Sequence, residues 1–420
     1  MADSENTRPF YKCTIPGEWD VKRLDEIATV VRGSSPRPAG DPRYFNGSFM
    51  PWLTVASLTN TSDGQTTVTE TEGHLTEEGA KQSRELKAGT LILSNSGATL
   101  GVAKLLGINC CANDGIAAFI DWDDKKADKL FALYFLNSRT KHFREVVAPG
   151  NGQPNLNTEL IGIEHIPLPP LAEQKAIAHV LGLMDRAIEK NNRLIAQKEL
   201  RKKWLMQNLL TGKKRLQGFT DEWSVCKLSD LFERVTRKNI AGCTNVVTIS
   251  AQRGFVRQTE FFNKSVASET LDNYFLVHRG EYCYNKSYSN GYPWGATKRL
   301  KDADEAVVTT LYICFELKDS EAANGNFFEY FFEANLLDRG LTQIAHEGGR
   351  AHGLLNVTPS DFFSLKITIP SFEEQTAIAK VLQTADKEIA LLKMRADKLR
   401  EQKKGMMQQL LTGKMRLRTQ

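Results

Sequence analysis

The sequence repeats itself once, at an offset of 201 residues. Residues 171–216 and 372–417 align without a gap and share EQ-x-AIA-x-VL near the start and LLTGK near the end. The repeat extends outward, because EWDVKRL from Glu18 matches EWSVCKL from Glu222. The stretches between these matched segments are far less alike. A chain of this kind predicts two units that share a frame and differ in their interiors.

The two matched segments have the pattern of long α-helices. Lys, Glu, Gln and Arg, which are good helix formers, surround apolar residues in 4/3 spacing. Pro169, Pro170 and Pro370 precede the segments, and Gly212 and Gly413 follow them, as expected of helix starts and stops. The positions predicted to pair are Ile177, Leu181, Met184, Ile188, Ile195, Leu205 and Leu209, with Ile378, Leu382, Ile389, Leu392, Leu399, Met406 and Leu410.

A helix of about 40 residues is roughly 60 Å long, and its apolar stripe needs a partner. Chain order favours antiparallel pairing of the two helices, provided that the second unit returns its ends close together. The alternative is that each helix packs only on its own domain. Asn191, Lys198, Lys202 and Lys403 are polar positions in the stripe; they either set the register or mark where it opens to solvent or partners.

The remainder of the chain has an α+β composition with long polar loops. The predicted organisation is a pseudo-two-fold repeat of two globular domains separated by two long antiparallel coiled-coil helices. We expect strands at Thr90–Ser94, Ala117–Asp121, Val246–Ser250, Gly280–Tyr284 and Val307–Glu316. The domain boundaries expected are residues 1–168, helix 169–216, residues 217–369 and helix 370–420.

Composition excludes several classes of protein. No run approaches the roughly 18 apolar residues that a membrane span requires, and the polar start of the chain does not resemble a secretory signal. The seven cysteines are dispersed without C-x-x-C spacing, which favours reduced thiols in the cytoplasm over disulfides or a metal site. The net charge of +5 permits binding to nucleic acid without requiring it.

Signatures of catalysis are not found in the sequence. Gly212–Lys213 and Gly413–Lys414 lack the upstream glycine of a phosphate-binding loop, and no N-P-P-[YF] tetrapeptide of adenine methyltransferases occurs. Asp121–Lys126 is acidic enough for a nuclease site, but a solvated turn explains it better. We therefore expect no catalytic centre, no cofactor and no metal.

Basic, amide, hydroxyl and aromatic residues alternate in the loops of both units. Such side chains can contact base edges or phosphates, although each loop can equally be a solvated turn. The candidates in the first unit are Arg32, Ser34, Arg37, Asn95, Ser96, Thr99, Lys104, Asn151, Gln153 and Asn155. Those in the second unit are Arg237, Lys238, Lys286, Tyr288, Asn290, Tyr292, Trp294, Lys298, Arg350 and His352.

Over its whole length the chain resembles the specificity subunit of type I restriction-modification systems. The resemblance rests on the W-x-x-x-x-L start of each half, VVRGSSP…PWLTVASL (residues 30–58), NSGATLG (residues 95–101) and the EQ-x-AIA-x-VL…LLTGK helices. It implies that each half holds a target recognition domain for one part of a split site in double-stranded DNA. It also implies helices that dock two modification (methyltransferase) subunits, to which motor-nuclease restriction subunits add.

Two other functions remain open at this point. A coiled-coil interaction scaffold would explain the helices but not the two divergent polar-loop domains. A self-contained restriction-modification enzyme would need methylase and nuclease motifs. The sequence therefore predicts a non-catalytic DNA-reading subunit.

Overall fold

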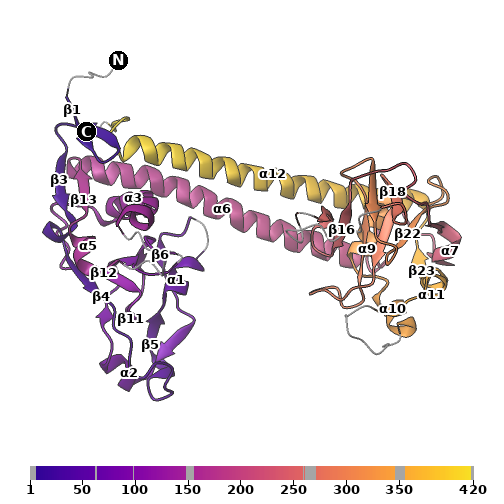
Figure 1. Cartoon of the computed structure of the whole chain (residues 1–420), viewed down its shortest axis with the longest axis horizontal. Coiled ribbons are helices and arrows are strands. Elements are labelled where there is room, and N and C mark those ends of the chain that lie inside the picture. Colours follow the sequence, from indigo (N-terminus) through magenta and orange to yellow (C-terminus); the bar gives the residue numbers. More distant parts are fainter. Residues whose placement is uncertain are drawn as a thin grey trace. The chain divides into compact units, whose positions relative to one another are not determined.

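The computed structural model describes most of the chain, namely residues 6–61, 64–97, 99–147, 156–258, 260, 271–345 and 355–417. It divides into two compact units. The first comprises residues 1–195 and 392–420, and the second comprises residues 196–391. Each unit therefore contains one part of each long helix, α6 (Leu171–Leu209) and α12 (Phe372–Leu410) (Figure 1).

The first unit is built around two sheets. One has five strands in the order β4 (Thr29–Arg32), β12 (Ile116–Ile120), β9 (Leu91–Ser94), β10 (Ala103–Leu106) and β6 (Thr67–Val68). The other has four strands in the order β7 (Gly73–Leu75), β5 (Phe45–Leu53), β11 (Cys110–Ala112) and β8 (Glu85–Leu86).

Shorter elements complete the first unit. The strands form two antiparallel pairs, β1 (Thr7–Phe10) with β2 (Cys13–Pro16) and β3 (Asp20–Arg23) with β13 (His165–Leu168). The helices are η1 (Leu24–Glu26), α1 (Val55–Thr59), α2 (Glu77–Lys81), α3 (Lys129–Ser138), α4 (Thr140–His142), η2 (Phe143–Val147) and α5 (Thr158–Gly162).

The second unit repeats the central part of this plan. Its main sheet has the order β15 (Phe232–Val235), β22 (Ile313–Leu317), β19 (Tyr282–Asn285) and β20 (Ala296–Arg299). Its strand pairs are β14 (Ser224–Lys227) with β23 (Lys366–Ile369), β16 (Val247–Ser250) with β17 (Gly254–Arg257), and β18 (Phe275–His278) with β21 (Glu305–Val308). Its helices are α7 (Leu228–Leu231), α9 (Gly325–Glu333), α10 (Asp338–Ile344) and α11 (Pro359–Ser364).

The two main sheets have matching strand orders. β4, β12, β9 and β10 of the first unit correspond in sequence and order to β15, β22, β19 and β20 of the second. The expected single strand at Val307–Glu316 is wrong in one respect: it comprises two strands, β21 and β22, which belong to different sheets. Between them Tyr312 N–H donates to the Thr309 carbonyl, 3.3 Å away, and this turn redirects the chain.

Apolar burial holds each unit together. In the second unit the Phe232 ring contacts those of Tyr282, Phe315, Phe328 and Phe332, with ring centroids 5.0–5.8 Å apart. Aromatic side chains bury large apolar areas, so this cluster joins α9 to the sheet. None of the described helices is long and apolar enough to cross a membrane.

Both long helices begin close to the expected starts, but α6 ends at Leu209 and α12 at Leu410, short of the expected bounds at residues 216 and 420. Each starts one or two residues after its proline and stops before its glycine, and Gly212 and Gly413 adopt φ of +68° and +70°. A Cβ at Gly413 would lie 2.4 Å from Pro16 Cδ, while one at Gly212 would lie 3.4 Å from the Trp223 ring. Glycine therefore lets the chain turn closely against the start of each globular frame.

Within the first unit, the start of α6 packs antiparallel to the end of α12. Asn191 Nδ2 donates to the Leu392 carbonyl, 2.8 Å away, and Lys403 pairs with Asp185 at 2.5 Å. Farther along, Arg416 makes two hydrogen bonds of 2.7 and 2.8 Å to the Glu173 carboxylate. Partner numbers fall along α12 as they rise along α6, which defines an antiparallel pair.

Within the second unit, the end of α6 packs antiparallel to the start of α12. Lys198 pairs with Glu388 and Lys202 with Asp386, each at 2.5 Å. The predicted antiparallel pairing is thus confirmed within each unit. All four polar positions of the seam make contacts across the helix pair, which favours their role in setting the register.

The positions predicted to pair are at least partly buried throughout. Eight of them are less than 10% exposed: Ile177, Leu181, Ile188, Leu209, Ile378, Leu382, Ile389 and Leu410. The half-buried ones are Met184, Ile195, Leu205, Leu392, Leu399 and Met406.

The repeated Glu-Gln pair at each helix start connects the helix to its unit. Gln174 Oε1 accepts from the backbone N–H of Asp128, the N-cap of α3, and its Nε2 donates to the Pro169 carbonyl, each at 2.8 Å. Gln375 makes the same two contacts, at 2.9 Å, with Asn324, the N-cap of α9, and Pro370.

The glutamate that precedes each of these glutamines forms an ion pair with an arginine that follows the end of the other long helix. Glu374 accepts two hydrogen bonds of 2.6 Å from Arg215 and one of 3.1 Å from Trp223 Nε1. Glu173 is the equivalent acceptor for Arg416 in the first unit. The repeated Glu-Gln motif therefore holds the start of each long helix against the end of the other.

We predict that Glu374→Ala lowers the free energy of unfolding of the second unit by about 3 kcal/mol, because it leaves the Arg215 charge and the Trp223 N–H without their acceptor. Urea unfolding followed by tryptophan fluorescence measures this. Asp304→Ala is the control, since it removes a largely exposed partner of Arg279 and should change stability by less than about 1 kcal/mol. Equal losses in the two variants would contradict a special role for Glu374.

Candidate nucleic-acid interface

In the first unit three candidate residues surround one acidic turn. The backbone after β4 meets the turn between β11 and β12, where Arg32 Nε donates to the Asp114 carbonyl at 2.6 Å. Arg37 donates to the Asp114 carboxylate at 3.0 Å. Arg32, Ser34 and Arg37 are exposed, so the turn holds the loop while leaving these side chains accessible.

The Asp114 carboxylate is the anchor of this loop. Burial works to raise its pKa, but hydrogen bonds from the Ser35 hydroxyl and from backbone amides, together with the Arg37 charge, lower the pKa below its ordinary value. Asp114 therefore stays ionised at neutral pH. Sequence reasoning missed it, because 77 residues separate it from Arg37.

Asn95 and Ser96 lie beside the same turn. Asn95 N–H donates to the Gly115 carbonyl at 2.9 Å, and the Asn95 carbonyl accepts from Leu156 N–H at 2.7 Å. Asn95 is fully buried, and neither end of its side-chain amide has a hydrogen-bond partner among the described residues. Its amide therefore faces the interior of the unit and not its surface; Ser96 is half-buried.

Thr99 and Lys104 have structural contacts. The Thr99 carbonyl accepts from the Ser94 hydroxyl at 2.6 Å. Lys104 Nζ donates to the Gln65 carbonyl, which ties β10 to the chain before β6. Both side chains are half-buried.

In the second unit Arg237 and Lys238 are held by neighbouring groups. Arg237 lies 3.1 Å from the buried Glu281 carboxylate and 3.8 Å from Glu316. Lys238 Nζ donates to the Asn273 carbonyl at 2.7 Å and lies 4.8 Å from the centroid of the Phe275 ring. These contacts, together with the backbone hydrogen bond from Leu276 N–H to the Arg237 carbonyl, hold Arg237 and Lys238 against the start of β18.

The loop between β19 and β20 has an anchored base. Tyr292 Oη donates to Glu333 at 3.1 Å, Lys298 pairs with the same carboxylate, and Trp294 packs against the aromatic core. Lys286 is half-buried, and burial together with the Arg234 charge lowers its pKa.

The tip of the same loop is exposed. Ser289 and Tyr292 form reciprocal backbone hydrogen bonds of 3.2 and 2.8 Å around Asn290 and Gly291, which has φ of +80°. Tyr288 is 67% exposed and Asn290 is also exposed. An aromatic face and a side-chain amide at the tip of a fixed loop can stack on or hydrogen-bond to a ligand.

Five candidates lie outside the described residues: Asn151, Gln153, Asn155, Arg350 and His352. The residues that follow them have matching contacts, since Leu156 N–H donates to the Asn95 carbonyl and Leu355 N–H donates to the Lys286 carbonyl at 3.0 Å. Asn95 and Lys286 occupy equivalent positions after β9 and β19. The backbone after the central strand therefore makes the same contact in both units, but the side chain at that position is an amide in the first unit (Asn95) and an ammonium in the second (Lys286).

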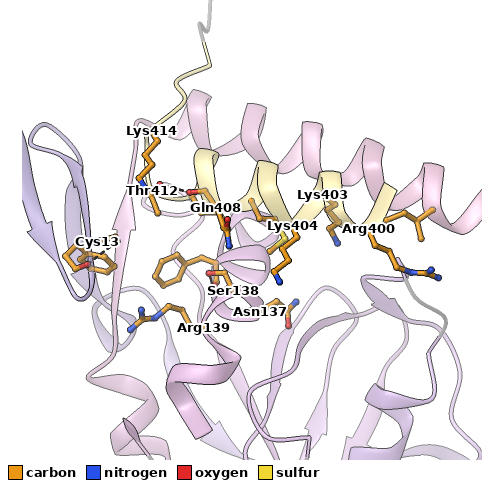
Figure 2. Close-up of a pocket in the computed structure, with 15 residues that line it drawn as sticks. Cys13, Asn137, Ser138, Arg139, Arg400, Lys403, Lys404, Gln408, Thr412 and Lys414 are labelled. Carbon is orange, nitrogen blue, oxygen red and sulfur yellow. Dashed lines mark hydrogen bonds between the residues drawn. The ribbon is translucent and has the colours of Figure 1, made fainter. Parts of the chain in front are cut away.

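A basic groove in the first unit was not expected from the sequence. It encloses about 700 Å³ between the β1–β2 hairpin, the end of α3 and the end of α12. Figure 2 shows Arg139 on the α3 side and Arg400, Lys403 and Lys404 along α12. Among the described residues, no group of three or more His, Cys, Asp or Glu side chains is placed to hold a metal ion.

Comparison with known sequences shows the class of the two units. A family model for the type I restriction modification DNA specificity domain matches the chain twice, over residues 16–199 and 220–401. The type I restriction enzyme MjaVIII specificity subunit of Methanocaldococcus jannaschii is 22% identical, covering 99% of this chain and 97% of the relative. The putative MjaX specificity subunit from the same organism is 26% identical over 70% of each chain.

Solved structures share the fold. The S subunit of the type I restriction-modification system from M. genitalium aligns with a TM-score of 0.53 and 15% identity, covering 96% of this chain and 97% of that chain. A structure reported for complex assembly and conformational transition of the type I R-M system aligns with a TM-score of 0.58 and 14% identity, covering 97% and 100%.

The two copies of one α+β frame, each packed on antiparallel helix segments and each with polar loops, coincide with the two matches to the DNA specificity domain. The chain belongs to the family of type I restriction-modification specificity subunits and carries two DNA specificity domains.

We predict that Gly295→Ala loosens the loop between β19 and β20. Gly295 has φ of +81°, and a Cβ there would lie 2.4 Å from the Asn285 carbonyl oxygen. Gly291→Ala is the matched control, because it has the same sign of φ but open space around the added methyl group. Limited chymotrypsin digestion should cut faster at Tyr288 or Tyr292 in Gly295→Ala than in the control; equal rates would contradict the anchoring.

Proposed function

We propose that this chain reads a bipartite sequence in double-stranded DNA, one half-site per unit, as a non-catalytic subunit of a type I restriction-modification complex. The observation that carries the proposal is the repeated frame with different loops. The same strand order, helix contacts and strand ends occur twice, while the loop residues presented by the two units differ. A protein that reads two unlike short sequences needs this combination.

The exposed candidates are the best placed for DNA contacts. Arg32 and Arg37 can reach phosphates or guanine edges, and Asn290 can pair with adenine. Tyr288 can pack on sugar or on an exposed base. The anchored candidates, such as Arg237, Tyr292 and Lys298, support these loops. Asn95 is buried, so a contact between its side chain and a base requires a rearrangement of its loop.

We propose that the long helices set the distance between the two recognition domains and bind the modification subunits. Each has 39 residues and hence a length of about 58 Å. Exposed apolar side chains on them suit protein contacts: Leu200 is 69%, Met394 68% and Leu391 66% exposed. We assign this surface to two modification subunits, with the motor-nuclease subunits joining through them in the cytoplasm.

A protein-interaction scaffold without DNA reading is the alternative. It requires the helix surface but gives no role to Arg32, Arg37, Tyr288 and Asn290. The two functions differ in one measurable property, the dependence of DNA methylation on this chain.

The deciding experiment is a methyladenine map. This chain is co-expressed with its modification subunit in a methylation-free host, and the genomic DNA is sequenced for modified bases. We expect a split motif with a fixed gap that disappears when this chain is omitted. A continuous motif, or methylation independent of this chain, would support the scaffold.

A second prediction tests the spacer. One heptad is inserted into both helices, after Ile195 in α6 and before Leu392 in α12, so that the apolar seam keeps its face. The insertion adds about 10 Å, or about three base pairs of rise. The methyladenine map should show unchanged half-sites and a changed gap. A changed half-site with the original gap would contradict the spacer model.

A further inference from the structure

The two units share a contact among three side chains, one from the globular part and one from each long helix. In the first unit Tyr134 Oη, from α3, donates to Asp185 Oδ2 of α6 at 2.7 Å. Lys403 Nζ, from α12, donates to the other oxygen of the same carboxylate at 2.5 Å. The Lys403 ammonium also lies 5.2 Å from the centroid of the Tyr134 ring.

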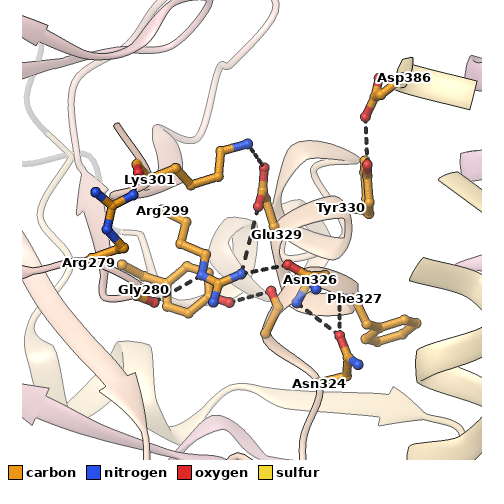
Figure 3. A network of polar contacts seen from close by, with 12 residues as sticks. Arg279, Gly280, Arg299, Lys301, Asn324, Asn326, Phe327, Glu329, Tyr330 and Asp386 are labelled. Carbon is orange, nitrogen blue, oxygen red and sulfur yellow. Dashed lines mark hydrogen bonds and ion pairs between the residues drawn. The ribbon is translucent and has the colours of Figure 1, made fainter. Parts of the chain in front are cut away.

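The second unit repeats this contact with the helices exchanged. Tyr330 Oη, from α9, donates to Asp386 Oδ2 of α12 at 2.6 Å, as Figure 3 shows. Lys202, from α6, pairs with Asp386 Oδ1 at 2.5 Å and lies 5.3 Å from the centroid of the Tyr330 ring. Each contact therefore joins three elements, the α3 or α9 helix of the globular part and both long helices.

The first of these contacts is nearly enclosed, which makes it strong and directional. Tyr134 and Asp185 are 1% and 3% exposed. Burial and the Asp185 carboxylate raise the pKa of Tyr134, so its hydroxyl remains a donor at neutral pH. A hydrogen bond to a charged group is shorter and stronger than a neutral one, and Lys403 supplies the countercharge that a buried carboxylate needs.

Apolar contacts alone do not fix the angle between a globular part and a helix pair. They are non-directional and tolerate small slips. A phenol has few rotatable bonds, and its hydroxyl must meet one carboxylate oxygen. The Gln174 and Gln375 side chains already hold the N-termini of α3 and α9. The tyrosine contact adds a second directional point on each helix, and two such points restrict how α3 or α9 is turned about the long helices.

We propose that Tyr134–Asp185–Lys403 and Tyr330–Asp386–Lys202 orient each recognition domain on the helix pair and thereby determine which gap between half-sites the protein accepts. This inference rests on the proposed bipartite reading. B-DNA turns by roughly 35° per base pair, so a domain free to turn by a comparable angle can meet a half-site displaced by one base pair. These six side chains are positioning residues for specificity and touch no base.

The test compares Tyr134→Phe, Tyr330→Phe and the double variant with the unchanged chain, each with the modification subunit. Substrates carry both half-sites with the gap unchanged, or shortened or lengthened by one base pair. We expect the variants to recognise the same half-sites but to prefer the original gap at least about tenfold less strongly, because a hydrogen bond to a charged group contributes at least such a factor.

Tyr11→Phe is the matched control. Tyr11 Oη also donates to a carboxylate, Glu164 at 3.0 Å, but this bond joins the β1–β2 hairpin to the residue before β13 and includes no residue of either long helix. It should leave the gap preference unchanged. If Tyr330→Phe fails to accumulate, Asp386→Ala replaces it, since it removes the acceptor of the same hydrogen bond and the Asp386 side chain is 42% exposed.

Two failures are distinguishable. Tyrosine variants that are less stable to heat yet keep the full gap preference would overturn this inference and leave bipartite reading intact. An unchanged chain that yields no split motif would overturn the proposed function itself.

Discussion

In both units a carboxylate on one long helix pairs with a cation on the other long helix or just after its end, and three of these carboxylates, Glu173, Asp185 and Glu374, are buried. Glu173 and Glu374 receive arginines at the helix ends, and Asp185 and Asp386 receive lysines farther in. A carboxylate removed from water is costly unless it is paired, so each contact permits one register of the helix pair. The position of each globular frame follows from that register, because Gln174 and Gln375 beside these glutamates hold the N-termini of α3 and α9.

The frame and the loops are stabilised by different means. Apolar packing and the repeated helix contacts maintain the frame in both units. The loops depend on single acidic residues, Asp114 in the first unit and Glu333 in the second, which hold cationic or hydroxyl side chains at the loop base. This division allows the exposed side chains to differ between the units without altering the strands below them. This division is the physical basis on which one fold can present two unlike loop surfaces.

The sequence predicted the frame well and the loop roles less well. The helix positions follow from the prolines, the glycines and the apolar spacing, and the antiparallel sense follows from chain order. The burial of Asn95 and the pairing of Arg237 with Glu281 do not follow, since both depend on partners that are distant in the chain. A polar residue after a strand has the same sequence signature whether it faces solvent or the interior. The run at Val307–Glu316 illustrates the same limit, because one turn divides it between two sheets.

The sequence by itself determined the duplication, the two long helices and the family, because repeats and helix periodicity are local patterns that survive without knowledge of contacts. Tertiary structure alone decided which residues share a site. The acids that anchor the loops and the two Tyr–Asp–Lys contacts bring together side chains that lie tens to hundreds of residues apart in the chain. The exposure of Tyr288 likewise depends on how the loop around it folds. Such pairings depend on how strands and helices pack, and packing is a property of the folded chain as a whole.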